Sequence, residues 1–382
     1  MGPGIVSQSE AAEWSIVPSI GVKGVYNDNL LLTPLPHDET YGYWISPAAE
    51  FAGKTERFEV SGRVASDFVT YYGGEETRFT NIFLPLSMRY KTETDQFGFT
   101  GGLNRDNTLA SELLTTGLVL RFTQRNQWTA SPSWSRTLTE KLTLETSFQF
   151  SDTTYENALR LGLADYQMYG GSGGLRYQLT EYDQIQLSGS YMKFYTTNAP
   201  SGFSASIPGF SLNLTHAFTE SLTGIVYAGP RFINATTKAL TNTIQTRDAV
   251  WVFGTSLTKK FESSLLELTL ARDIMPSGFG LLIQTDRAGL TLSHNISENL
   301  TTSVSTNGYL TSGITRFPQG GTFPDSRYFT VTPKASWRFL EWWRIEVSYT
   351  YGRRDIDNFP EAMSNATTIM LSYYPPKLAV SN

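Results

Sequence analysis

The chain has 382 residues, of which 17% are charged and 13% aromatic, and it carries a net charge of −5 and no cysteine. The lack of cysteine excludes disulfides, thiolate metal sites and cysteine nucleophiles. The mild negative charge, without any basic run, gives no argument for binding nucleic acid. No stretch approaches the ~18 consecutive apolar residues of a transmembrane helix.

Apolar and polar residues alternate with period two in long segments along the whole chain. In the first segment, Trp14 and Ile16 share one face, and Ser15 and Ser19 share the other. Such segments run well beyond the roughly five or six residues of an ordinary strand. Long strands with one apolar face and one polar face are typical of a barrel that spans a bilayer, and the 20 Tyr and 23 Phe suit its aromatic girdles.

The segment 118–151 predicts a long strand, a tight turn at 137–141 and a second strand. An alternative places a turn at 123–126, which would change the strand count and exchange the sides of all later loops. Gln124 and Asn126 keep the parity of the apolar residues around them, and this favours one long strand that projects beyond the membrane.

Connections alternate between short turns and long polar loops, and the segments number about eighteen. The short turns are at 52–55, 91–95, 137–141, 180–183, 219–221, 262–264, 297–299 and 340–342. The long loops are at 28–40, 105–117, 152–164, 196–206, 234–246, 311–326 and 354–366. Short periplasmic turns and long extracellular loops are the pattern of outer-membrane barrels, and an even strand number puts both termini on the same side.

The predicted fold is all-β: a closed antiparallel transmembrane β-barrel of about eighteen strands over 12–375. A flexible segment, 1–11, precedes it and a tail, 376–382, follows it. The N-terminal segment has no basic region followed by an apolar one, so it predicts a mature chain without a signal peptide. The loops 105–117, 152–164 and 312–325 are candidates to fold into the lumen as gates.

Strand parity places a set of basic residues on the polar, lumen-lining face. These candidates are Lys23, Arg57, Arg63, Arg89, Arg121, Arg125, Arg176, Arg231, Arg287, Lys334, Arg338 and Arg344. Rings of Arg and Lys favour anions in a pore. The alternative is an internal ladder of ion pairs with the acids of the same face, which are Glu50, Glu59, Asp67, Glu145, Glu267 and Glu346. Trp44, Tyr71 and Tyr309 also point inward and are candidates for stacking on sugars.

No catalytic, cofactor or metal site is predicted. His216 and His294 each lie near a short turn without the partners that a metal or an acid–base pair needs, and no G-x-S-x-G motif is present. Arg272 shares the parity of Leu268 and Leu270, which would face lipid, so it is expected near the outer edge of the membrane or beyond a bulge.

Three segments resemble β-barrel porins that are associated with exopolysaccharide gene clusters. They are VPSIGVKGVYNDNLLLT (17–33), SPSWSRTLTEKLTLETSFQFSDTTY (131–155) and TPKASWRFLEWWRIEVSYTYGRRD (332–355), with ISPAAEF (45–51) as a reduced copy. The resemblance implies an outer-membrane barrel through which a secreted polysaccharide leaves the cell, together with a periplasmic polysaccharide export protein. It carries no binding residues over to this chain.

The expected function is therefore passive conduction in the bacterial outer membrane, among outer-membrane lipids, with a secreted polysaccharide as the cargo. A general or anion-leaning diffusion porin for small solutes is the first alternative, and a plugged structural or adhesin barrel is the second. No enzyme activity and no cofactor are expected.

Overall fold

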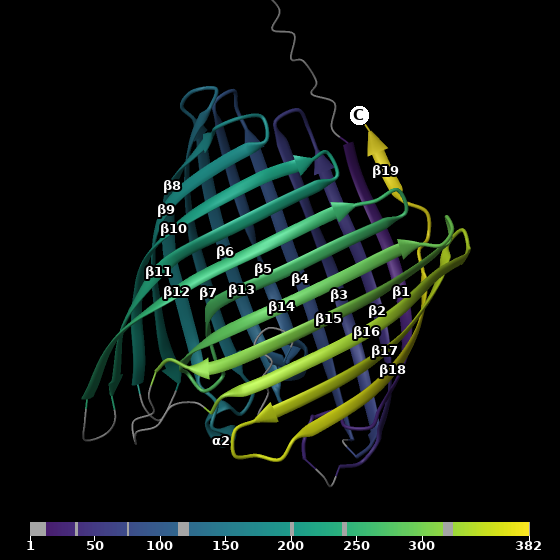
Figure 1. The fold of residues 1–382 in the computed structure, drawn as a ribbon. Helices are drawn as coiled ribbons and strands as arrows, with labels where there is room; N and C mark the ends of the chain where they lie inside the picture. Colours follow the sequence, from purple (N-terminus) through teal and green to yellow (C-terminus); the bar gives the residue numbers. More distant parts are fainter. Residues whose placement is uncertain are drawn as a thin grey trace, which may run out of the picture.

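Residues 13–34, 37–74, 76–113, 122–198, 202–238, 243–315 and 324–381 are described by the computed structural model (Figure 1). The first strands are β1 (Glu13–Asn27), β2 (Thr40–Lys54), β3 (Phe58–Gly73), β4 (Thr77–Lys91), β5 (Asp95–Asn107), β6 (Gln124–Thr137), β7 (Leu142–Tyr155), β8 (Asp165–Gln178) and β9 (Asp183–Asn198). The others are β10 (Gly202–Thr219), β11 (Leu222–Lys238), β12 (Thr243–Lys260), β13 (Ser264–Pro276), β14 (Leu282–Asn295), β15 (Leu300–Gly313), β16 (Ser326–Leu340), β17 (Trp343–Ile356), β18 (Ala362–Tyr373) and β19 (Leu378–Ser381). Two short helical turns, η1 (Leu109–Leu113) and α2 (Ala158–Leu161), interrupt this series.

Antiparallel pairing of each strand with its neighbours in sequence closes β1 to β18 into a barrel. β1 pairs with β2 along one side and with β18 and β19 along the other. Closure leaves no edge strand to be unsatisfied in lipid. The predicted closed barrel of eighteen strands is confirmed. The start of β1 pairs with the last strand, Glu13 opposite Ser381, so the two ends of the described chain meet at the end with the short turns.

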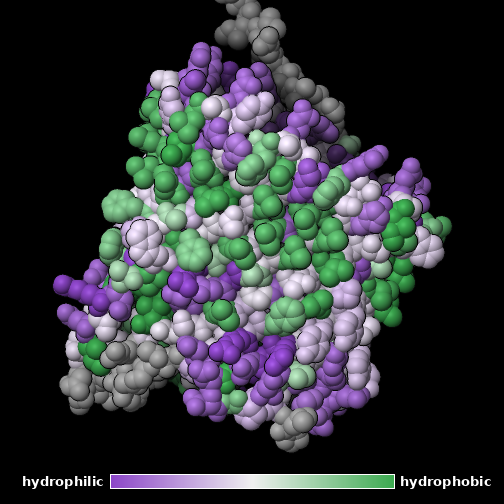
Figure 2. All heavy atoms as spheres, viewed as in Figure 1, coloured by the Kyte–Doolittle hydropathy of each residue, from purple (hydrophilic) through white to green (hydrophobic). Residues whose placement is uncertain are grey.

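The outer wall carries an apolar belt, with hydrophilic side chains gathered at both ends of the barrel (Figure 2). Alternation produces the belt, because every second residue of each strand points outward. Trp251, Leu187 and Phe210 are 64%, 61% and 59% exposed on this face. A belt of this kind places the protein in a membrane, and single-chain barrels of this type are bacterial outer-membrane proteins. No helix in the described residues is long and apolar enough to cross a membrane.

The expected long strand through 118–134 is wrong at 122 and 123, which are described and are not strand. β6 pairs with β5 from Gln124 and with β7 from Arg125, so the alternative turn at 123–126 is also excluded. Phe122 leaves the parity of the strand and packs its ring on Phe79, 5.6 Å away between centroids. The amide of Thr123 bonds to the side chain of Thr108. The segment 118–121 lies outside the described residues.

Two of the expected long loops, 196–206 and 234–246, are strand over most of their described residues. β10 and β12 each have 18 residues, well beyond the roughly ten that a barrel strand needs to cross a membrane. The segments 202–206 and 243–246, predicted as loop, belong to these strands, because their Ser, Thr and Gln residues continue the alternation. The wall of β9 to β12 therefore extends past the apolar belt at the extracellular end.

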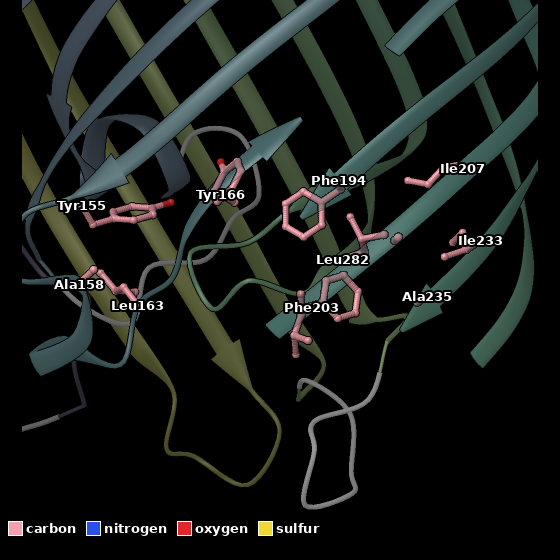
Figure 3. Packing of buried hydrophobic residues seen from close by; sticks show 12 residues of the cluster. Tyr155, Ala158, Leu163, Tyr166, Phe194, Phe203, Ile207, Ile233, Ala235 and Leu282 are labelled. Carbon is pink, nitrogen blue, oxygen red and sulfur yellow. The ribbon is translucent and has the colours of Figure 1, made fainter. Parts of the chain in front are cut away.

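An apolar core lies inside the barrel against the extracellular half of this extended wall (Figure 3). It joins inward side chains of β9 to β11, among them Phe194 and Ile233, to loop residues such as Leu163 and Leu281. The expectation that the inner face is polar throughout is therefore wrong here. Loops fold onto this wall and exclude water from it, so the wall can carry apolar residues on its inner side.

Arg272 lies on the outward face and forms a two-pronged ion pair with Asp286. The distances from its Nε and Nη2 to the two carboxylate oxygens are 2.6 and 2.7 Å. Its guanidinium also lies 5.2 Å from the centre of the Phe253 ring. The neighbouring strand thus supplies the counter-ion that makes a charge tolerable on a wall facing lipid, which a parity argument on one strand does not reveal.

We expect Asp286→Leu alone to lower the free energy of unfolding by roughly 1–3 kcal/mol, because it leaves Arg272 unpaired beside lipid. The double variant Arg272→Leu with Asp286→Leu is expected to recover most of this loss, since two apolar side chains suit the belt. Urea unfolding in lipid vesicles measures both. Equal destabilisation of the single and double variants would contradict this account of the pair.

Candidate functional site

The segment between β5 and β6 turns into the lumen, where η1 forms a short coil inside the barrel (Figure 1). The amide of Thr108 bonds to the carbonyl of Thr123, 3.0 Å away, so the segment is tied together at its base. The hydroxyl of Ser111 donates to the carbonyl of Asn107 at 2.9 Å. This confirms that the loop predicted at 105–117 folds inward, over the part that the structure describes.

One side of η1 is held by the β7 wall. The Tyr155 hydroxyl donates to Glu112 Oε1 at 2.5 Å. Next to it, Arg125 on β6 forms two hydrogen bonds with Asp106 on β5, 3.1 and 3.0 Å long. These side chains are largely buried, so water does not compete for their hydrogen bonds. The bonds therefore fix the position of the segment.

The other side of η1 is held by the opposite wall. Leu113 belongs to an apolar cluster with Tyr328 on β16, and Leu32 from the β1–β2 loop joins the same cluster. The Arg354 guanidinium on β17 donates to the carbonyl of Leu32 and holds that loop inward. β7 and β16 are nine strands apart in a ring of eighteen. Five residues of η1 and their contacts therefore bridge the lumen from one wall to the wall facing it.

A third inward loop, which sequence reasoning missed, supports η1 from beside it. It connects β13 to β14 over 277–281 and has Gly280 at φ 71°, where a side chain would be strained. A Cβ at Gly278 would come within 2.9 Å of Glu112 Oε1. Gly278 and Gly280 are the features of the sequence from which this inward loop could have been predicted. The β7–β8 loop also folds inward through Leu163, as predicted for 152–164, whereas 316–323, most of the third predicted gate, lies outside the described residues.

Burial raises the pKa of Glu112, the acidic group of η1. The Tyr155 hydrogen bond and the charge of Arg125 on β6 oppose this shift, and Asp106 on β5 adds to it. Tyr166 on β8 also lies close by. The pKa of Glu112 is higher in the attached segment than it would be in water, so the attachment is most stable when Glu112 is protonated. The attachment therefore weakens as the pH rises from the ordinary carboxyl pKa through the raised one.

We expect the channel conductance to increase and become noisier as the pH rises from about 4 to about 8, a range that covers an ordinary and a raised carboxyl pKa. Glu112→Gln is expected to remove this dependence while keeping the hydrogen-bonding shape. Bilayer recordings across the range measure it, with Glu220→Gln in a periplasmic turn as the control. A pH profile unchanged by Glu112→Gln would assign the effect to another group.

Five of the predicted lumen-lining arginines form ion pairs with acids of the inner wall. The pairs are Arg63–Glu50, Arg89–Glu59, Arg125–Asp106, Arg176–Glu145 and Arg287–Asp273, at 4.0, 3.5, 3.0, 2.7 and 3.3 Å. All five are cross-strand pairs, which stiffen the wall and cancel its charge locally. For these residues the ladder alternative describes the geometry.

Three other predicted residues lie together at the periplasmic mouth. Lys334, Arg338 and Arg344 line one hollow of about 320 Å³ with Glu298 and Glu346. None of the three basic residues forms an ion pair within the described part of the chain. Arg338 bonds to the amide oxygen of Asn299 instead, at 2.9 and 3.1 Å. We call Lys334, Arg338 and Arg344 the basic mouth cluster.

The remaining basic candidates do not join this cluster. The ammonium of Lys23 lies 3.1 Å from the centre of the Trp44 ring, and Arg231 donates to the carbonyl of Phe210 at 2.7 Å. Arg57 lies in the turn between β2 and β3 rather than on the wall, because β3 begins one residue later, at Phe58. Arg121 lies outside the described residues.

The three stacking candidates already have partners on their rings. Trp44 is covered by Lys23 and meets the edge of Tyr71 at 6.5 Å. Tyr71 is only 6% exposed, and Tyr309 stacks on Tyr328 at 5.9 Å. These contacts occupy one face or edge of each ring, and a role in stacking on sugars stays a prediction.

Each histidine near the short turns forms a side-chain hydrogen bond with a residue of the neighbouring strand or turn. His216 Nδ1 lies 2.6 Å from Asp183 Oδ1, and His294 Nδ1 lies 2.8 Å from the hydroxyl of Ser264. Within the described ranges no three His, Cys, Asp or Glu residues converge in a way that would hold a metal ion.

Comparison with solved structures finds barrels of similar extent. OccK7 (OpdD) of Pseudomonas aeruginosa is 10% identical, with 96% of this chain and 99% of that chain covered and a TM-score of 0.46. OccAB3 of Acinetobacter baumannii is 12% identical, with 95% and 99% covered and a TM-score of 0.43. OccK2 (OpdF) of Pseudomonas aeruginosa, in complex with glucuronate, is 10% identical, with 96% and 98% covered and a TM-score of 0.47. No family model and no curated protein matches the chain.

Proposed function

We propose that this protein is an outer-membrane diffusion channel for small solutes, with a preference for anions. The observation that carries the proposal is η1, which reaches from Tyr155 on one wall to Tyr328 on the opposite wall. A segment fixed across a lumen sets the width of the passage, and solutes must pass beside it. Small molecules fit such a passage better than a long polymer does.

The preference for anions is carried by the basic mouth cluster. Five arginines of the inner wall, by contrast, are paired with carboxylates at 2.7 to 4.0 Å. At the periplasmic mouth the three basic residues keep their charge without a partner in an ion pair. Their hollow also contains Glu298 and Glu346, so basic residues are in excess there, and an excess of Lys and Arg at a pore mouth raises the local concentration of anions.

Export of a polysaccharide, implied by the resemblance to exopolysaccharide-associated porins, is the weaker interpretation. A polymer could pass only if η1 left the lumen. The contacts of η1 with Tyr155 on one wall and with Tyr328 on the other are buried, and they oppose such a movement. The periplasmic export protein implied by the same resemblance stays a prediction. The apolar core inside the barrel gives some weight to a plugged barrel, which would show no flux.

Liposome uptake of solutes of different charge and size tests the proposal. Glucuronate, which is bound in one of the similar structures, serves as the anionic probe. We expect glucuronate to enter faster than glucosamine, a cation of similar size, and dextran to be excluded. Passage of dextran would favour the export conduit, and absence of all uptake would favour the plugged barrel. Either result would overturn the proposal.

A further inference from the structure

A polar hollow lies on the outer surface of the extended wall, just beyond the apolar belt. The register of β9 to β12 places four outward residues side by side across four strands. These are Lys193, Ser206, Asn234 and Arg247. Ser204 and Thr236 form part of the next row toward the extracellular end. The hollow lined by these residues has a volume of about 540 Å³.

The charge of this hollow is uncompensated. Its lining includes no Asp or Glu, and neither Lys193 nor Arg247 forms an ion pair with any described residue. The Ser, Thr and Asn side chains between them add hydroxyl and amide groups that donate and accept hydrogen bonds. Two cations flanking a row of neutral hydrogen-bonding groups suit a phosphate on a sugar.

The neighbouring rows show how deep the hollow lies. One step and two steps closer to the membrane, the same strands present Tyr191, Phe210 and Trp251, which are 51%, 59% and 64% exposed. These rings mark the girdle where acyl chains meet headgroups. The hollow therefore lies at the level of the headgroups of the outer leaflet.

The wall behind the hollow is closely packed on its inner side. On the inner side of the same rows, Phe194, Ile207 and Ile233 are at most 4% exposed and belong to the apolar core (Figure 3). Packing on that side holds the strands in place beyond the bilayer. A preorganised surface loses little entropy when a ligand binds to it.

We propose that this surface binds the phosphorylated sugar headgroup of an outer-leaflet glycolipid, with its acyl chains along the rings of the girdle. Lys193 and Arg247 contact the phosphate groups, and Ser206 and Asn234 bond to sugar hydroxyls. The binding fixes the depth and rotation of this side of the barrel in the membrane. It is independent of what passes through the lumen.

Native mass spectrometry of the full chain in detergent, with diphosphoryl lipid A as the probe, tests the proposal. We expect Lys193→Gln with Arg247→Gln to weaken binding by about tenfold, because each basic residue at a membrane surface contributes several-fold to the attraction of anionic lipid. Arg327→Gln is the matched control, since Arg327 is an outward residue that already has Asp355 at 3.9 Å. Heat-modifiable mobility on gels verifies that every variant is folded.

Phosphatidylethanolamine and inorganic phosphate complete the set of probes. We expect the double variant to retain phosphatidylethanolamine as well as the wild type does. We also expect inorganic phosphate to compete poorly with lipid A. Equal lipid A binding by the wild type and the double variant would overturn the proposal. So would an equal loss in Arg327→Gln, or displacement of lipid A by inorganic phosphate at low concentration, which would assign the hollow to a free anion.

Discussion

Replacing Leu109–Leu113 with a Gly-Ser linker of equal length is expected to raise the single-channel conductance by at least about twofold, because the narrowest cross-section limits an aqueous pore. The replacement removes the Glu112 contact with Tyr155 and the packing of Leu113 on the opposite wall. The barrel keeps all its strand pairing, so it should still fold. Planar-bilayer recordings give the conductance directly.

The matched control is Leu159→Ser in α2, because Leu159 lies in another inward loop but is 55% exposed. Its conductance should equal that of the wild type. An unchanged conductance in the linker variant would mean that η1 does not limit the passage. It would also remove the main argument for a channel restricted to small solutes.

Neutralising the basic mouth cluster with Lys334→Gln, Arg338→Gln and Arg344→Gln is expected to lower the permeability ratio of anions to cations by roughly tenfold at low salt. Each unit charge about 8 Å from a passing ion in water contributes roughly 0.5 kcal/mol, so three together contribute about 1.5 kcal/mol, and a tenfold change corresponds to ~1.4 kcal/mol. The effect should shrink as salt shortens the Debye length. Reversal potentials in a chloride gradient measure the ratio.

The control for this variant removes one positive and one negative charge together, so the net charge stays the same. Arg287→Gln with Asp273→Asn neutralises an ion pair of the inner wall at 3.3 Å. Its selectivity should match that of the wild type. If the control shifts the ratio as far as the cluster variant does, the selectivity comes from wall structure rather than from the charge of the basic mouth cluster.

Most of the architecture is readable from alternation. Strand parity placed Arg63, Arg89 and Arg176 where they find Glu50, Glu59 and Glu145 across the neighbouring strands. Period two is a local property, and closure of the barrel follows from the lack of water in the bilayer. The strand pairing observed between β1 and β18 is the consequence.

The contents of the lumen are not readable in the same way. Phe122 breaks the parity because it packs on Phe79 inside the barrel, and the inner wall is apolar at Phe194 because loops cover it. Both depend on contacts between segments far apart in sequence. Strand register also decides whether a basic residue has an acidic partner. It gives Arg287 a partner in Asp273 and gives the basic mouth cluster no ion pair among the described residues.

The reversal potential of the wild-type protein in a planar bilayer under a salt gradient tests the central claim most directly. The account predicts a steadily open channel whose reversal potential has the sign of net anion permeation. A cation-selective reversal potential, or a silent bilayer from folded protein, would contradict a small-solute channel that prefers anions.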